Sequence, residues 1–260
     1  MTSKITDQFQ QPATDPEETF DLVCVGFGPA SLAIAVALHD RGVRAKVLFL
    51  ERQRSFSWHA GMLLPNARMQ ISFMKDLATL RDPRSKFTFV NYLKTKDRLV
   101  AFTNLSTFLP LREEFNDYLT WCASHFEQDV RYGQEIISVS PINNRQGPIN
   151  SWRVVSKDVN TNHQSFITAR HVVVAIGGKP KIPRGLSDDG SNSMFIHSSG
   201  YSILVPAILR SSDKVYHLAV IGGGQSSAEI FNDLQGRYPN SRITLYTGAS
   251  ALKPSDDSPL

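Results

Sequence analysis

A strand, a glycine turn and a helix occur twice in this sequence, and this repeat constrains the fold more than any other feature. The first copy is FDLVCVGFGPASLAIAVALHDRG at residues 20–42, and the second is HLAVIGGGQSSAEIFNDLQGR at residues 217–237. A short apolar strand, a glycine turn and a helix in this order are typical of a β-α-β unit that binds a dinucleotide. Gly26 and Gly222 occupy the same place in the two copies, 196 residues apart. The sequence therefore predicts an α/β protein with two Rossmann-like dinucleotide-binding units.

The first turn has the form GxGxxS, built from Gly26, Gly28 and Ser31. Such a turn needs a tight bend, a close approach of the backbone to a pyrophosphate, and a small residue where helix meets strand. A second expected strand, residues 43–51, ends in Glu51, 23 residues after Gly28. A carboxylate there accepts hydrogen bonds from ribose hydroxyls and repels a 2′-phosphate. We therefore expect the first unit to bind FAD or NAD rather than NADP.

The second turn repeats this form with Gly222, Gly224 and Ser227. The position that corresponds to Glu51 is Thr247, so the second unit has no acid to repel a 2′-phosphate. Two dinucleotides in one chain suggest a flavin and the nicotinamide nucleotide that reduces it.

The rest of the chain predicts a lead, an insert and a further group of strands. Residues 1–19 are polar and are expected to be a disordered lead, and residues 52–75 are expected to be irregular. Residues 76–126 have apolar positions at helical spacing, interrupted by Pro83 and Pro110, which predicts a helical insert. Three extended stretches follow, at residues 130–141, 151–157 and 170–178.

The segment VVVAIGGKPKIP resembles the stretch that carries the chain between the two domains of flavoproteins with two dinucleotides. We therefore expect an FAD-binding domain over residues 20–185, including the helical insert, and the start of an NADPH-binding domain over residues 186–260.

Composition excludes several classes of function. The net charge is +4, but the basic residues are scattered, which disfavours nucleic acid as a partner. The longest apolar stretch, residues 32–38, is far shorter than the ~20 residues of a membrane-spanning helix. The lead lacks the pattern of a signal peptide. Cys24 and Cys122 are the only cysteines, so no disulfide framework, metal site or CxxC redox pair is expected. We expect a cytoplasmic protein.

Several fragments carry a more specific resemblance. They are DLVCVGFGPASLAIA, MQISFMKDLATLRDPRS, FTNLSTFLP, HSSGY, GGGQSSAEIFNDLQ and KPSDDSP. From about residue 20 to residue 260 the chain resembles the microbial N-hydroxylating flavin monooxygenases, in particular the fungal L-ornithine N5-monooxygenases of siderophore biosynthesis. The resemblance implies N5-hydroxylation of L-ornithine with FAD, NADPH and molecular oxygen.

The resemblance also assigns roles to positions. Together with the two turns it gives these FAD-binding residues: Gly26, Gly28, Ser31, Glu51, Arg52, Trp58, His59, Gln70 and Ile136. The corresponding NADPH-binding residues are Gly222, Gly223, Gly224, Gln225, Ser226 and Ser227. Among them, Gln70 resembles the residue beside the isoalloxazine and Ile136 a main-chain contact on the adenine side. Lys75 resembles the lysine that holds the ornithine carboxylate, and no catalytic acid or base is identified.

The sequence departs from the family pattern in two places. Gly248 stands where the family has an arginine for the 2′-phosphate, which leaves open the choice between NADPH and NADH. The chain ends at Leu260, where family members continue, so we expect the second unit to be incomplete. Two alternatives stay open: an inactive truncated fragment, and a flavin-dependent pyridine-nucleotide reductase, against which the missing CxxC counts. Homo-oligomerisation is also left open.

Overall fold

The structure is a computed structural model that describes residues 19–142, 148–180, 182, 194–248 and 252. The chain forms two compact units, each made of two segments. The first comprises Met1–Phe56 and His125–Gly177, and the second comprises Ser57–Ser124 and Gly178–Leu260. Of the expected disordered lead, residues 1–18 lie outside the described residues, whereas Thr19 already belongs to a strand.

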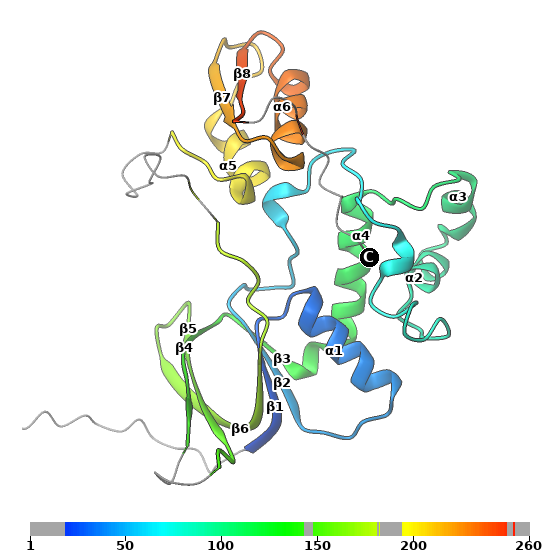
Figure 1. The fold of residues 1–260 in the computed structure, drawn as a ribbon, viewed down its shortest axis with the longest axis vertical. Coiled ribbons are helices and arrows are strands. Elements are labelled where there is room, and N and C mark those ends of the chain that lie inside the picture. Colours follow the sequence, from blue (N-terminus) through cyan, green and yellow to red (C-terminus); the bar gives the residue numbers. More distant parts are fainter. Residues whose placement is uncertain (1–18, 143–147, 181, 183–193, 249–251, 253–260) are drawn as a thin grey trace, which may run out of the picture. The chain divides into compact units, whose positions relative to one another are not determined.

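A six-stranded sheet in the order β3-β2-β1-β6-β5-β4 dominates the described part of the first unit (Figure 1). Its parallel strands are β3 (Val130–Tyr132), β2 (Val47–Glu51), β1 (Thr19–Val25) and β6 (Gln164–Val174). Strands β5 (Trp152–Asp158) and β4 (Gln134–Pro141) continue the sheet in antiparallel pairs. Helix α1 (Pro29–Asp40) connects β1 to its parallel neighbour β2. The expectation of an α/β fold is confirmed, and the sheet is mainly parallel.

Strand β1 lies inside this sheet, with β2 on one side and β6 on the other. Its side chains Val23 and Cys24 are fully buried, as are Leu32 and Val36 of α1. A strand covered on both faces reads as a continuous apolar run, which explains why the first copy of the repeat is so apolar. Burial also raises the pKa of the Cys24 thiol to about 11.

Two sequence expectations for this sheet were wrong in detail. The stretch expected as one strand over residues 130–141 is two strands, because Gly133 has a φ of +73° and ends β3. Strand β6 begins at Gln164 instead of residue 170, since residues 164–169 pair with β5 in a hairpin. Asp158 starts the hairpin turn by accepting hydrogen bonds from the backbone N–H groups of Asn160 and Thr161.

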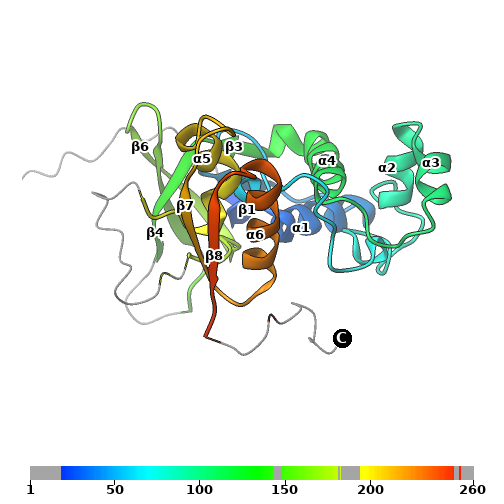
Figure 2. The ribbon, with the colours of Figure 1, turned by 90° about the horizontal axis from the view of Figure 1, so that it is seen from above.

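The second copy of the repeat lies in the second unit. Strands β7 (His217–Ile221) and β8 (Arg242–Tyr246) are parallel, and helix α6 (Gln225–Arg237) connects them and lies alongside them (Figure 2). The core beside them also uses helix α5 (Tyr201–Ile208), which follows the 3₁₀ turn η4 (Ser198–Gly200), and the 3₁₀ turn η1 (Ala60–Met62). Its buried residues are Met62, Leu64, Tyr201, Val205, Val220, Ile230, Leu234 and Tyr238.

The expected helical insert is also part of the second unit. Its helices are α2 (Phe89–Thr95), α3 (Leu99–Asn104) and α4 (Arg112–Ala123), and the 3₁₀ turn η3 (Ser124–Asp129) follows. Helix thus begins at Phe89 and not at residue 76, because residues 76–88 form turns. Within the segment expected to be irregular lies the 3₁₀ turn η2 (Phe73–Lys75). The compact units therefore group the insert with the second glycine turn, whereas the division into FAD and NADPH domains remains a prediction.

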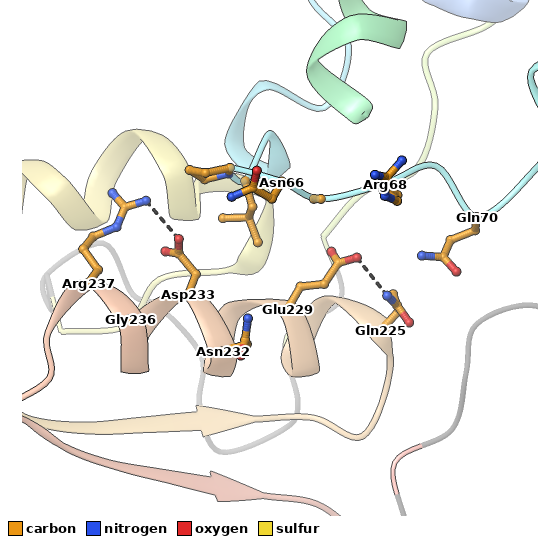
Figure 3. Close-up of a pocket in the computed structure, with 12 residues that line it drawn as sticks. Asn66, Arg68, Gln70, Gln225, Glu229, Asn232, Asp233, Gly236 and Arg237 are labelled. Carbon is orange, nitrogen blue, oxygen red and sulfur yellow. Dashed lines mark hydrogen bonds and ion pairs between the residues drawn. The ribbon is translucent and has the colours of Figure 1, made fainter. Parts of the chain in front are cut away.

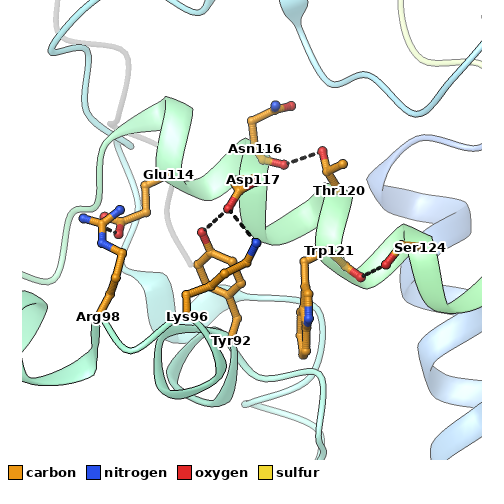
Figure 4. Close-up of polar contacts among 9 residues, drawn as sticks. All are labelled: Tyr92, Lys96, Arg98, Glu114, Asn116, Asp117, Thr120, Trp121 and Ser124. Atoms are coloured by element: carbon orange, nitrogen blue, oxygen red, sulfur yellow. Dashed lines mark hydrogen bonds and ion pairs between the residues drawn. The ribbon is translucent and has the colours of Figure 1, made fainter.

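Polar contacts hold the helices of the insert together (Figure 4). Tyr92 of α2 donates a hydrogen bond to Asp117 of α4 at 2.6 Å. Arg98 lies 3.0 Å from Glu114, a nearly buried carboxylate whose pKa is raised by burial. Cys122 of α4 is buried as well, and burial raises the pKa of its thiol.

None of the helices in the part of the chain that the structure describes is both long and apolar enough to span a membrane. Among the same residues, no group of three or more His, Cys, Asp or Glu side chains is arranged to hold a metal ion.

Candidate functional site

The first glycine turn contains one glycine that the protein itself requires. Gly26 follows β1 with a φ of +90°, which L side chains rarely adopt. A Cβ on Gly26 would lie 2.6 Å from the backbone oxygen of Ala175, just after β6. Both the bend and the close contact with the neighbouring chain segment therefore exclude a side chain here.

Gly28 has a different environment, although it belongs to the same turn. Its φ of −85° is ordinary, and a Cβ placed on it would meet no atom within 4 Å. Neither backbone conformation nor packing against the protein requires glycine here. The open space lies at the N-terminus of the 12-residue helix α1, where free N–H groups favour an anion. Ser31 is fully buried, as expected for a small residue between helix and strand.

Glu51 ends β2 and binds the same turn. Its Oε2 accepts a hydrogen bond from the N–H of Phe27 at 2.7 Å, and its Oε1 accepts one from the N–H of Gln53 at 2.8 Å. Each carboxylate oxygen can accept more than one hydrogen bond, so capacity for ribose hydroxyls remains. Arg52 is exposed directly after β2, and Ile136 lies on β4 opposite Ser156.

The second glycine turn repeats the division between a required and an unrequired glycine. Gly222 has a φ of +147°, and its Cβ would lie 3.3 Å from that of Ser227. Gly224, the N-cap of α6, has a φ of −96° and open space around the Cβ position. The hydroxyl of Ser227 is used within the turn, donating to the carbonyl of Gly224 at 2.6 Å. Gly223 and Ser226 flank these positions, and Ser226 is exposed.

A cleft of about 470 Å³ in the second unit brings two of the expected site residues together (Figure 3). Gln70, expected beside the flavin, and Gln225, expected in the NADPH loop, both line it. The other lining residues are Leu64, Pro65, Asn66, Ala67, Arg68, Glu229, Asn232, Asp233, Gly236 and Arg237. The side of the cleft formed by α6 is polar. It carries the amides of Gln225 and Asn232, the carboxylate of Glu229 and the ion pair between Asp233 and Arg237.

The sequence analysis missed an ion pair at the end of this cleft. Arg112 of α4 binds Glu229 of α6 through both guanidinium nitrogens, at 2.8 and 3.1 Å. The two side chains are only 16% and 14% exposed. Glu229 also accepts a hydrogen bond from the side chain of Gln225 at 2.8 Å. The first residue of the second turn's helix is therefore linked to the helical insert, and a separation of 117 residues gave no local signal for this.

Trp58 and His59, expected to wrap the FAD, lie in the second unit near the start of α4. The Trp58 ring is 5.2 Å from the His59 ring and 5.9 Å from the ring of Phe115, measured between centroids. The pKa of His59 is lowered by burial and by the positive charge of Arg112. The residues expected to hold FAD are thus divided between the two compact units.

Lys75 ends the short turn η2 and is exposed. Its side chain makes no hydrogen bond or ion pair with any of the described residues. Its backbone N–H donates to the carbonyl of Ser72 at 3.0 Å.

Comparison with known proteins adds a family to this geometry. Residues 18–260 match the family model described as L-lysine 6-monooxygenase/L-ornithine 5-monooxygenase. The chain is 56% identical over 240 residues to an L-ornithine N(5)-monooxygenase of Ajellomyces capsulatus, covering 92% of this chain and 50% of the relative. It is 51% identical over 258 residues to one of Beauveria bassiana, covering 95% of this chain and 48% of the relative. The chain spans about half the length of these curated relatives.

Solved structures show the same similarity. The ornithine hydroxylase of Pseudomonas aeruginosa matches with a TM-score of 0.84 and 44% identity, over 93% of this chain and 58% of that one. An ornithine N-hydroxylase of Kutzneria sp. 744, described with reduced FAD, NADP⁺ and L-ornithine, matches with a TM-score of 0.82 and 38% identity. That match covers 93% of this chain and 56% of the other.

Proposed function

The chain belongs to the L-lysine 6-monooxygenase/L-ornithine 5-monooxygenase family, and on this premise we propose that the complete protein hydroxylates the side-chain amine of L-ornithine at N5. FAD, NADPH and molecular oxygen are the proposed cofactors and co-substrate. The N-hydroxylated amino acid is proposed to enter hydroxamate siderophore biosynthesis in the cytoplasm.

The observation that carries the cofactor proposal is the open space at Gly28 and at Gly224. Both glycines occupy ordinary backbone conformations that other residues could adopt, and no atom of the described residues lies within 4 Å of a Cβ placed at either position. A ligand that approaches the backbone closely explains why the turns nevertheless have glycine there. Both turns open long helices, whose N-termini favour a pyrophosphate. These features support two Rossmann-like units.

Glu51 supports FAD in the first unit, because its carboxylate stands at the end of β2 beside the turn. The second copy of the strand-turn-helix repeat has Thr247 at the position that corresponds to Glu51. No acid stands there to repel a 2′-phosphate, which supports NADPH as its ligand. We therefore propose that residues 20–185 form the FAD-binding domain, with the insert, and that residues 186–260 begin the NADPH-binding domain.

The bound flavin would supply the chemistry of oxygen activation and transfer. The proposed role of this chain's own residues is to bind and orient the dinucleotides and the substrate. The first turn and Glu51 are proposed to hold the dinucleotide, and the ammonium of Lys75, which has no partner among the described residues, is proposed to hold the ornithine carboxylate. Neither role requires a side-chain nucleophile.

The proposal is tested by assaying the complete protein that contains this chain with FAD, NADPH, oxygen and L-ornithine. We expect N5-hydroxyornithine to form in step with NADPH consumption. Hydrogen peroxide as the sole product, with or without ornithine, would refute the hydroxylase function and favour a flavin-dependent reductase.

Lys75 provides a sharper test of the substrate. A charge-assisted hydrogen bond contributes about 1.5–3 kcal/mol, so Lys75→Ala is expected to weaken ornithine binding roughly 10- to 100-fold. Flavin reduction by NADPH should remain nearly unchanged. A collapse of flavin reduction in this variant would instead assign Lys75 to the nicotinamide site.

A further inference from the structure

We propose that Asp76 is a positioning residue: it fixes the backbone beneath Lys75 so that the lysine ammonium can meet the substrate carboxylate. This inference rests on the proposed function, since it concerns how that site is held. Lys75 has a long side chain with four rotatable bonds and no partner among the described residues. The position of its backbone therefore limits where the ammonium can reach.

The carboxylate of Asp76 accepts four hydrogen bonds. Its Oδ1 accepts from the backbone N–H groups of Ala78 and Thr79, at 2.9 and 2.6 Å. Its Oδ2 accepts from the hydroxyl of Thr79 at 2.7 Å and from the N–H of Phe89 at 2.6 Å. The first three bonds close a turn directly after Lys75. The fourth ties that turn to the first residue of α2, thirteen residues further along the chain.

The residues on either side of Lys75 are anchored independently. Two residues after Lys75, Leu77 donates its N–H to the hydroxyl of Tyr118 at 3.1 Å, and that hydroxyl donates to the carbonyl of Phe87 at 2.8 Å. Tyr118 lies on α4 and is fully buried. Before Lys75, the Phe73 ring stacks on Phe108 with 5.6 Å between centroids. The backbone at Lys75 is therefore fixed by contacts both before and after this residue, although the lysine side chain is exposed.

These contacts attach Lys75 to the helical insert rather than to a loose loop. Helices α2 and α4, which receive the contacts from Asp76 and Leu77, are themselves joined by the bond from Tyr92 to Asp117 (Figure 4). Structural contacts of this kind act on binding by fixing the backbone in advance, so that less backbone freedom is lost when the ligand arrives. Asp76 therefore belongs to the site although it need not touch the substrate.

The test uses a substrate that lacks the group Lys75 is proposed to hold. The compound 1,4-diaminobutane has both amines of ornithine but no carboxylate. In Asp76→Asn, an amide NH₂ replaces one acceptor oxygen, so at least one backbone N–H loses its acceptor, whereas the Thr79 hydroxyl can turn and accept from the amide. We expect the preference for ornithine over diaminobutane, measured as the ratio of KM values in the complete protein, to fall about three- to tenfold. The KM for diaminobutane, the KM for NADPH and the flavin content should stay unchanged.

Two further variants guard against a general loss of folding. Thr79→Val keeps the carboxylate and removes one donor to it, so the same ratio should fall by less. Asp82→Asn is the matched control, because Asp82 caps an exposed turn in the same segment by accepting from the N–H and Nε of Arg84. This control should leave the ratio unchanged.

The outcomes separate this inference from the function it rests on. If Lys75→Ala removes the preference for ornithine but Asp76→Asn and Thr79→Val leave it intact, the positioning role is refuted. A Lys75→Ala variant that retains the preference would instead refute the proposed role of the lysine itself. Equal losses for both substrates in Asp76→Asn would show that Asp76 serves stability alone.

Discussion

The two glycine turns share a backbone design but differ in what surrounds them. In each, the first glycine (Gly26 or Gly222) has a positive φ, and a Cβ placed two residues later, on Gly28 or Gly224, would meet no atom of the described residues within 4 Å. The first turn follows a strand inside a six-stranded sheet and is bound by Glu51. The second turn follows β7, whose only described sheet partner is β8, and its helix is linked to the insert by the Arg112–Glu229 ion pair.

Burial shows the same contrast. Val23 and Cys24 of β1 are fully buried, whereas Ile221 of β7 and Tyr246 of β8 are 53% and 57% exposed. The comparison teaches that a few residues suffice to specify the local turn. How tightly the surrounding sheet packs against the turn determines how much stability a substitution in the turn costs. Equivalent substitutions in the two turns should therefore lower the free energy of unfolding by unequal amounts.

The largest expected effect comes from the glycines with positive φ. Gly26→Ala combines a strained φ with a contact of 2.6 Å to a backbone oxygen, and should lower the free energy of unfolding by about 3–5 kcal/mol. Gly222→Ala meets only side-chain atoms, at 3.3 Å or more, and should cost about 1–3 kcal/mol. Urea denaturation of the complete protein measures both. Equal losses would contradict the contrast between the two sheets.

The open glycines should separate binding from stability. Gly28→Val places a side chain where only a ligand is expected, so bound flavin after purification should fall about 100-fold or more with little change in the melting temperature. Gly224→Val should leave flavin content unchanged and raise the Kd for NADPH instead. Flavin retained in a folded Gly28→Val variant would place the FAD elsewhere.

Support of the second turn by the insert is tested with a double-mutant cycle on Arg112→Ala and Glu229→Ala. For a largely buried bidentate pair we expect a coupling free energy of about 1–3 kcal/mol in unfolding. We also expect an increase in the KM for NADPH, because Glu229 holds Gln225. The exposed pair of Arg84 with Asp82 is a matched control and should show a much weaker coupling, because solvent screens it.

The smallest effect concerns nucleotide choice. A Cβ at Gly248 would meet no atom of the described residues within 4 Å, so the site offers room for the substitution Gly248→Arg. The new guanidinium should increase the preference for NADPH over NADH about tenfold, measured by flavin reduction rates. A parent protein that already strongly prefers NADPH would show that another residue binds the 2′-phosphate.

The sequence was sufficient where structure is set locally. Gly26 and Gly28 could be placed in one turn, and Glu51 beside it, because a dinucleotide-binding β-α-β unit needs those residue types at that spacing. The same reasoning placed Gly222 and Gly224. It was insufficient where partners are distant, since neither Arg112 with Glu229 nor Asp76 with Phe89 shows any spacing pattern.

Secondary structure followed the same division. The apolar strand β1 was recognised, but the polar first half of β6 was not, because its pairing with β5 depends on a hairpin turn begun by Asp158. The two strands on either side of Gly133 were merged, since the sequence alone does not show that this glycine takes a positive φ. Residues 76–88 were expected to be helical but form turns, with Asp76 accepting four hydrogen bonds.

The burial of both cysteines has a consequence for chemical ageing under the proposed function. The proposed oxygen chemistry would expose the protein to hydrogen peroxide, which attacks thiolates far faster than thiols. With a pKa of about 11, Cys24 is a thiolate in only about one molecule in ten thousand at pH 7. Cys122 is buried and protonated as well. Oxidative damage should therefore begin at exposed thioethers such as Met194, which is 82% exposed, while both thiols remain reduced through many turnovers.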